Sequence, residues 1–164
     1  DICKAVYELS NIDDTLIGAG SIITSQQALS GIQSGAKFLV TPVLEMSIVK
    51  FCKGRGIPLI TGASTANEAY SSWKVDNSII KIFPAKAMGG AEYIKDILKA
   101  MPFLKLMPAS GIGIDDCIDY LEAGAVAFGI GKAIYAEAPD YKTITKRASI
   151  VAQKVEDYLQ KINN

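Results

Sequence analysis

Short apolar runs alternate along the sequence with longer stretches of helical periodicity, which limits the folds that the chain can adopt. Short runs rich in β-branched residues are typical of strands, whereas apolar spacings of three and four residues are typical of amphipathic helices. We expect six strands, at 15–21, 36–42, 58–63, 78–84, 104–109 and 125–129. We expect helices at 1–10, 25–34, 45–54, 65–73, 90–100, 114–123 and 141–162.

This alternation predicts an α/β fold in which parallel strands are covered by helices. No Gly-x-Gly-x-x-Gly motif with a later acidic partner follows a first strand, so a dinucleotide-binding sheet is disfavoured. Glycines and small polar residues instead recur at the carboxyl ends of several strands, which is typical of a (β/α)₈ TIM barrel. About six of the barrel strands are then present, and we expect residues 1–164 to form a single barrel domain that is incomplete at its N-terminus.

Composition narrows the classes of function. The absence of histidine removes Ser-His-Asp and Cys-His catalysis and the commonest zinc ligand. Seventeen basic and seventeen acidic residues give a formal net charge of zero, so no charge pattern points to nucleic acid or to a membrane surface. The apolar runs are too short to span a bilayer, and no secretion signal is visible. Three cysteines far apart in the sequence indicate a reducing compartment, and we expect a cytoplasmic protein.

Lys81 lies inside the apolar run 79–85, which reads IIKIFPA. Because neighbours in a strand alternate between faces, Ile80 and Ile82 would pack against helices while Lys81 points into the barrel. Desolvation there disfavours the ammonium and lowers its pKa, and a neutral amine can attack a ketone. We therefore predict that Lys81 is a nucleophile. The alternative is a lysine on an edge strand that points into solvent.

Glycine-rich loops after the last two strands are candidate anion sites. Glycine lets backbone N–H groups approach an anion closely, and barrel enzymes often bind phosphate in the loops after strands seven and eight. Either loop alone is equally compatible with a simple tight turn, and the prediction depends on their pairing. The predicted phosphate-binding residues are Ala109, Ser110, Gly111, Ile130, Gly131 and Lys132.

Other strand ends carry weaker signals. The segment 18–21, Gly-Ala-Gly-Ser, permits a close approach of the backbone and places the Ser21 hydroxyl at the mouth of the barrel. A plain turn explains that segment equally well. The strand ends Thr41-Pro42 and Thr61-Gly62 combine a hydroxyl with a small or rigid neighbour. We expect Ser21, Pro42 and Thr61 to contact a substrate.

The sequence resembles the bacterial 2-keto-3-deoxy-6-phosphogluconate aldolases, a family that includes 4-hydroxy-2-oxoglutarate aldolases. The resemblance covers nearly the whole chain and rests on the segments 17–21, 35–42, 56–62 and, most specifically, 81–85 followed by two glycines. It implies a class I aldolase that uses no metal or cofactor and is usually a homotrimer. Lys81 would form an iminium with the C2 ketone of the substrate, and Phe83 would line the pyruvate end. Ser21 stands where the family has a threonine that touches the substrate.

The implied reaction is carbon–carbon cleavage of a small-molecule 2-keto acid, as in the Entner–Doudoroff branch of carbohydrate metabolism. A 2-keto-3-deoxy-6-phospho sugar acid would give pyruvate and glyceraldehyde 3-phosphate, and a 4-hydroxy-2-oxo acid would give pyruvate and an aldehyde such as glyoxylate. The alternatives are a phosphosugar isomerase or epimerase, and a barrel that binds a keto acid or phosphosugar with a different specificity or without catalysis.

The chain departs from the family in several places. The family's general-base glutamate and its substrate-binding arginine lie on a second strand that this sequence does not contain. The seventh-strand loop is usually Thr-Gly-Gly and here reads Ala-Ser-Gly, while the eighth-strand loop is usually Gly-Gly-Ser and here reads Ile-Gly-Lys. Ser110 could replace the missing hydroxyl, and Lys132 could supply a charge that serine does not. The reaction type is therefore better defined than the substrate.

Overall fold

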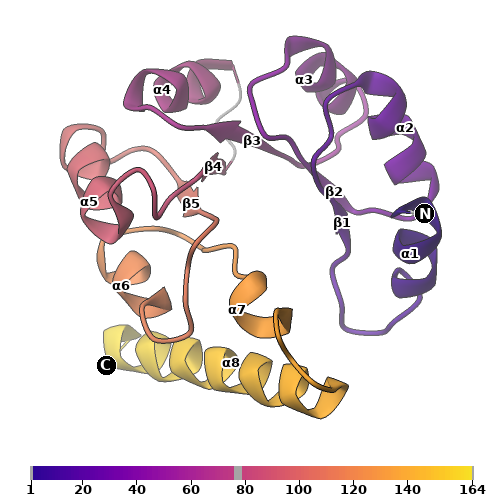
Figure 1. The fold of residues 1–164 in the computed structure, drawn as a ribbon. Helices are drawn as coiled ribbons and strands as arrows, with labels where there is room; N and C mark the ends of the chain where they lie inside the picture. Colours follow the sequence, from indigo (N-terminus) through magenta and orange to yellow (C-terminus); the bar gives the residue numbers. More distant parts are fainter. Residues whose placement is uncertain (1, 76–78, 164) are drawn as a thin grey trace. The chain divides into compact units, whose positions relative to one another are not determined.

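The computed structural model describes residues 2–75 and 79–163, in which strands and helices alternate (Figure 1). The strands are β1 (Gly18–Ala19), β2 (Phe38–Val40), β3 (Leu59–Ala63), β4 (Ile80–Ile82) and β5 (Leu106–Pro108). The helices are α1 (Ile2–Leu9), α2 (Ser25–Gln33), α3 (Met46–Lys53), α4 (Ala66–Val75), α5 (Gly90–Ala100), α6 (Cys117–Glu122), α7 (Lys132–Tyr135) and α8 (Tyr141–Asn163). The first residue of the expected strand 78–84 and the first residue of the expected helix 1–10 lie outside the described residues.

The strands are hydrogen-bonded in the order β1-β2-β3-β4-β5, so each strand lies beside its neighbour in the sequence. The first three strands are parallel, with Gly18 opposite Phe38 and Leu39 opposite Leu59. A helix follows each of these strands, because parallel neighbours need a crossover connection. The α/β fold with a parallel sheet that the sequence predicts is therefore confirmed.

The sixth strand expected at 125–129 is not a regular strand in the part of the chain that the structure describes. That segment runs parallel to β5 through one isolated bridge, between Ala109 and Gly129. Its amides donate to β5 at two points, from Val126 to Leu106 (3.0 Å) and from Gly129 to Pro108 (2.8 Å). The segment reads AVAFG, and alanine and glycine are poor strand formers, so a continuous ladder does not develop. The expected strands are also longer than the ladders, because an apolar run extends past its paired residues.

The chain divides into two compact units, residues 1–81 and 82–164, with the boundary inside β4. In the first unit, Leu39 and Leu59 of the sheet and Ile48 of α3 are almost fully buried and form one apolar core. Helix α2 begins with a capping box, in which Thr24 accepts from the Gln27 amide. These contacts place the ends of β1, β2 and β3 at one edge of this unit.

In the second unit, Ile82 of β4, Leu106 of β5 and Ile94 of α5 are fully buried. Helix α8 runs beside α6 and α7 (Figure 1) and is tied to α6 by the Tyr158 hydroxyl, which donates to the Leu121 carbonyl at 3.2 Å. Across the described residues, no helix combines the length and the apolar character that a bilayer crossing requires. This unit carries both of the glycine-rich loops that the sequence singles out.

Candidate active site

Lys81 is the central residue of β4, and its two neighbours are fully buried. Ile80 and Ile82 are both 0% exposed, whereas Lys81 lies on the opposite face and is half-buried. This agrees with the alternation expected from the sequence. Burial lowers the pKa of the Lys81 ammonium from its ordinary value of 10.5, because the charged form loses solvation. The side chain thus has the property that a nucleophilic amine requires.

The carboxyl ends of β2 and β3 approach each other at Pro42 and Gly62. A Cβ on Gly62 would lie 2.1 Å from the Pro42 carbonyl oxygen, so only glycine fits there. Pro42 and Gly62 also line one pocket together with Glu68 at the start of α4. Thr61, the preceding residue, is 2% exposed. The structure therefore brings the predicted substrate residues Pro42 and Thr61 to the same edge of the first unit.

Ser21 follows β1 and has an exposed side chain with a left-handed backbone (φ 58°). That conformation is uncommon for residues other than glycine and is enriched at functional sites. The next amide, of Ile22, donates to the Val40 carbonyl at 3.2 Å, which joins this turn to the end of β2. The sequence could not foresee the strained backbone, because serine carries no preference for it.

The hydroxyl of Thr41, one of the strand-end residues noted in the sequence, is buried in the structure. Thr41 is 1% exposed, and its hydroxyl oxygen has no hydrogen-bond partner in the part of the chain that the structure describes. Leaving such a group unsatisfied costs about 1–3 kcal/mol. The end of β2 therefore carries a buried polar atom next to the predicted substrate residue Pro42.

In the second unit, the two glycine-rich loops line a single pocket. Ser110 and Gly111 of one loop face the same pocket as Gly131 and Lys132 of the other. The pairing that the phosphate prediction depends on is therefore present. Among the other two residues of that prediction, Ala109 is 8% exposed and contributes its carbonyl to the Ala85 amide, while Ile130 is partly buried. Neither side chain is among those that line the pocket.

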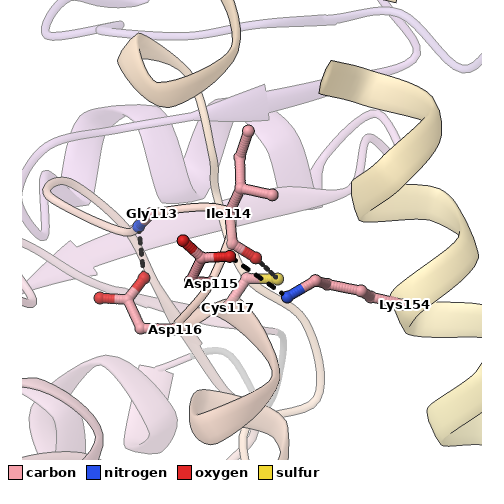
Figure 2. A network of polar contacts seen from close by, with 6 residues as sticks. All are labelled: Gly113, Ile114, Asp115, Asp116, Cys117 and Lys154. Atoms are coloured by element: carbon pink, nitrogen blue, oxygen red, sulfur yellow. Dashed lines mark hydrogen bonds and ion pairs between the residues drawn. The ribbon is translucent and has the colours of Figure 1, made fainter. Parts of the chain in front are cut away.

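The loop after β5 is held by Lys86 and Asp116. Ser110 and Gly111 both have left-handed backbones, and a Cβ on Gly111 would lie 2.5 Å from Cβ of Lys86. The Lys86 amide donates to the Ser110 carbonyl at 3.2 Å, and its ammonium lies 4.0 Å from the Asp116 carboxylate. Asp116 in turn accepts from the Gly113 amide at 2.5 Å (Figure 2). These local contacts give the loop its shape.

Figure 2 also shows how this loop is joined to α8. Lys154 of α8 lies 3.6 Å from the carboxylate of Asp115, and the Cys117 thiol lies 3.3 Å from the Ile114 carbonyl. Burial raises the pKa of the Cys117 thiol, which keeps it protonated as a weak donor. Cys117 is thus a core residue.

Phe83 is the first residue after β4 and is 38% exposed. Since it alternates with the fully buried Ile82, its ring lies away from the apolar core of its unit. The contact of Phe83 with a ligand, which the sequence resemblance implies, stays a prediction.

Comparisons with known proteins give one consistent result. The family model described as "KDPG and KHG aldolase" matches residues 1–147. The chain is 38% identical over 112 residues to the 2-dehydro-3-deoxy-phosphogluconate aldolase of Haemophilus influenzae, covering 68% of this chain and 53% of that protein. It is 31% identical over 152 residues to the KHG/KDPG aldolase of Escherichia coli, covering 90% of this chain and 70% of that protein.

Solved structures agree with this result. A KDPG aldolase from Legionella pneumophila, with pyruvate captured as a covalent carbinolamine intermediate, superimposes with a TM-score of 0.76 at 29% identity. That superposition covers 92% of this chain and 72% of the other. A structure described as native KDPGal superimposes with a TM-score of 0.84 at 23% identity, covering 96% of this chain and 76% of that one, and shows the shared fold.

The lengths of these proteins differ. The chain spans 53% and 51% of the two 2-dehydro-3-deoxy-phosphogluconate aldolases that it matches in Haemophilus influenzae and Treponema pallidum. The matched part nevertheless includes the strand with the half-buried lysine and both loops of the pocket, since the family model extends to residue 147. On this evidence, the chain belongs to the family of KDPG and KHG aldolases.

Proposed function

We propose that this chain carries the Schiff-base centre of a class I aldolase, a carbon–carbon lyase. The substrate is a 2-keto-3-deoxy-6-phospho sugar acid or a 4-hydroxy-2-oxo acid, and the products are pyruvate and an aldehyde. The observation that carries the proposal is Lys81, half-buried between two fully buried isoleucines and with a pKa lowered by desolvation. Membership of the aldolase family favours this reaction over the isomerase and epimerase alternatives.

The chemistry follows from a neutral amine at Lys81. Its nitrogen adds to the C2 ketone, and loss of water gives an iminium. The electrons of the C3–C4 bond then move toward the iminium nitrogen, the C4 hydroxyl loses its proton to a base, and the aldehyde leaves. The resulting enamine takes a proton at C3. Hydrolysis releases pyruvate and restores the amine. None of these reaction steps requires a metal or a cofactor.

The other residues of the site have binding roles in this proposal. Ser21, Pro42, Thr61 and Phe83 contact the keto-acid portion of the substrate. The pocket with Ser110, Gly111, Gly131 and Lys132 receives the phosphate or carboxylate of the aldehyde portion, with Ala109 and Ile130 supplying backbone beside it. An ammonium and backbone amides next to glycine are suited to an anion.

The assembly and location are part of the same proposal. The family resemblance implies a homotrimer. Analytical ultracentrifugation of the full chain would measure its oligomeric state. A cytoplasmic location is supported by Cys52 and Cys117, which are buried core residues in their respective units.

The test is covalent capture. Incubation with pyruvate and borohydride should add a stable mass to the peptide that contains Lys81, because reduction converts the iminium into a secondary amine. Lys81→Met should abolish the label. Lys37→Met changes an exposed lysine just before β2 and should leave the label intact. Equal labelling of the Lys81→Met protein would refute the assignment.

A further inference from the structure

Helix α7 is a single turn of four residues, and its first residue, Lys132, contributes to the anion pocket. Within the turn, the amides of Ile134 and Ala136 donate to the carbonyls of Gly131 and Lys132, both at 2.8 Å. A helix this short is not stable by itself, because nucleation costs more than one turn of hydrogen bonds returns. Contacts from outside the turn must therefore determine how it is oriented.

Arg147 of α8 supplies such a contact. One guanidinium nitrogen, Nη1, donates to the Ile134 carbonyl at 3.1 Å and to the Ala136 carbonyl at 2.9 Å. The last carbonyls of any helix lack partners inside it, so Arg147 satisfies oxygens that the turn cannot satisfy. These bonds are partly buried and involve an ionised donor, which makes them stronger than neutral hydrogen bonds in water.

The helix that carries Arg147 is itself anchored. Val151 of α8 is 7% exposed, and Tyr158 donates to the Leu121 carbonyl on α6. The guanidinium therefore projects from an element that has its own packing. A second contact of α8, the Lys154–Asp115 ion pair, reaches the loop after β5 outside the pocket; its carboxylate is fully exposed, so the pair is weak by comparison.

We infer that Arg147 is a positioning residue, which orients α7 so that the Lys132 ammonium faces the anion pocket. Arg147 does not itself line that pocket. It therefore acts through Lys132, and it sets how strongly the enzyme favours a phosphorylated aldehyde portion over an unphosphorylated one. The inference rests on the proposed function for its substrate, but its physical content is the affinity of the pocket for an anion.

A double-mutant cycle in the full chain tests the inference, with inorganic phosphate as the probe and calorimetry as the measurement. Lys132→Met and Arg147→Met should each weaken phosphate binding roughly tenfold, which is the usual scale for losing hydrogen bonds to a charged group. In the Lys132→Met background, Arg147→Met should have little further effect, because the residue that it positions is already gone. Arg147→Lys keeps the charge without the paired geometry and should recover part of the affinity.

Lys146→Met is the matched control. Lys146 is the exposed neighbour on α8, and in the described part of the chain it makes no hydrogen bond or ion pair with α7, so its loss removes the same charge without the contact. It should bind phosphate as the unmodified chain does. Thermal unfolding of each variant shows whether the fold is kept, and Arg147→Lys carries the test if Arg147→Met does not fold.

Three results would overturn the inference: no effect of Arg147→Met, an equal effect in both backgrounds, or no dependence of phosphate binding on Lys132. The last case includes a chain that binds no phosphate. Failure of the proposed function gives a different result, since pyruvate then does not label Lys81. A chain with coupled phosphate binding and no label would keep Arg147 as a positioning residue in an anion site of another kind.

Discussion

At the scale of single residues, close packing explains why glycine occurs at two of the strand ends. Gly62 packs so closely on Pro42 that any Cβ would collide with a carbonyl oxygen, and a Cβ on Gly111 would collide with the side chain of Lys86. Both glycines could be recognised in the sequence as strand-end signals, but the atoms that exclude a side chain could not. At Lys81 the opposite holds, because the alternation with Ile80 already predicts the burial that the structure shows.

The pH dependence of pyruvate capture tests the environment of Lys81. Burial lowers the pKa of its ammonium from 10.5, so the fraction of neutral amine rises with pH around a midpoint below that value. We expect the rate of borohydride trapping, measured from about pH 6 to about pH 12, to bend below pH 10.5. A bend at or above the ordinary lysine value would contradict a desolvated side chain.

The same pKa shift has a consequence for stability. Between the folded and unfolded pKa values the unfolded chain binds more protons at Lys81, so the free energy of unfolding increases with pH across that window. Lys81→Met removes the titrating group and should flatten this part of the profile, as measured by denaturant unfolding at a series of pH values. Lys37→Met, at an exposed position, serves as the control and should leave the slope as it is.

Among the secondary-structure elements, the helix ends follow the sequence more closely than the strands do. Thr24 and Gln27 form the capping box at the start of α2, and Gly35, with φ 102°, follows its end. These signals depend on residues within one turn, so they can be read locally. The strands are shorter than the apolar runs, and α7 was not expected, because four residues show no periodicity and the turn depends on Arg147.

The start of α2 offers a test at this scale. The Thr24 hydroxyl accepts from the Gln27 amide at 3.2 Å, and the Gln27 side chain accepts from the amides of Ile23 and Thr24. Thr24→Ala should lower the free energy of unfolding by about 1 kcal/mol, as for other lost N-caps. Gln26→Ala, in the same turn but outside the capping box, should change it little, and equal losses in the two variants would argue against the cap.

For the molecule as a whole, charge contributes little to stability. The formal net charge is zero. Ion pairs found among the described residues, such as Lys4–Glu8 and Lys95–Glu92, join side chains that are 62–75% exposed. Exposed pairs contribute little and are screened by salt. The buried apolar residues of the two units therefore carry the stability.

Salt should accordingly have a small effect on unfolding. We expect the melting temperature to change by less than about 3 °C between about 0.05 M and about 0.5 M sodium chloride, measured by circular dichroism. A strong decrease with salt would show that ion pairs stabilise the chain, contrary to the exposure of those pairs.

Much of the candidate site could be predicted, and the reason differs for each part. The half-buried lysine and the α/β fold follow from periodicity, which depends on residues one to four positions apart. The sequence predicts that the two glycine-rich loops lie together, because Ser110 and Lys132 follow consecutive strand segments. In the structure both residues line the same pocket. The contact of Lys86 with the loop after β5 had no sequence signal, since a lysine in a loop is most often solvated.

The alternation of strands and helices and the burial of Lys81 follow from the sequence alone, because each depends on neighbouring residues. The single bridge at 125–129, the unsatisfied hydroxyl of Thr41 and the reach of Arg147 to α7 depend on how distant segments pack. Arg147 lies thirteen residues beyond Ile134, and nothing within one turn of either residue specifies the bond. Such contacts arise from the packing of whole helices, which local periodicity does not encode.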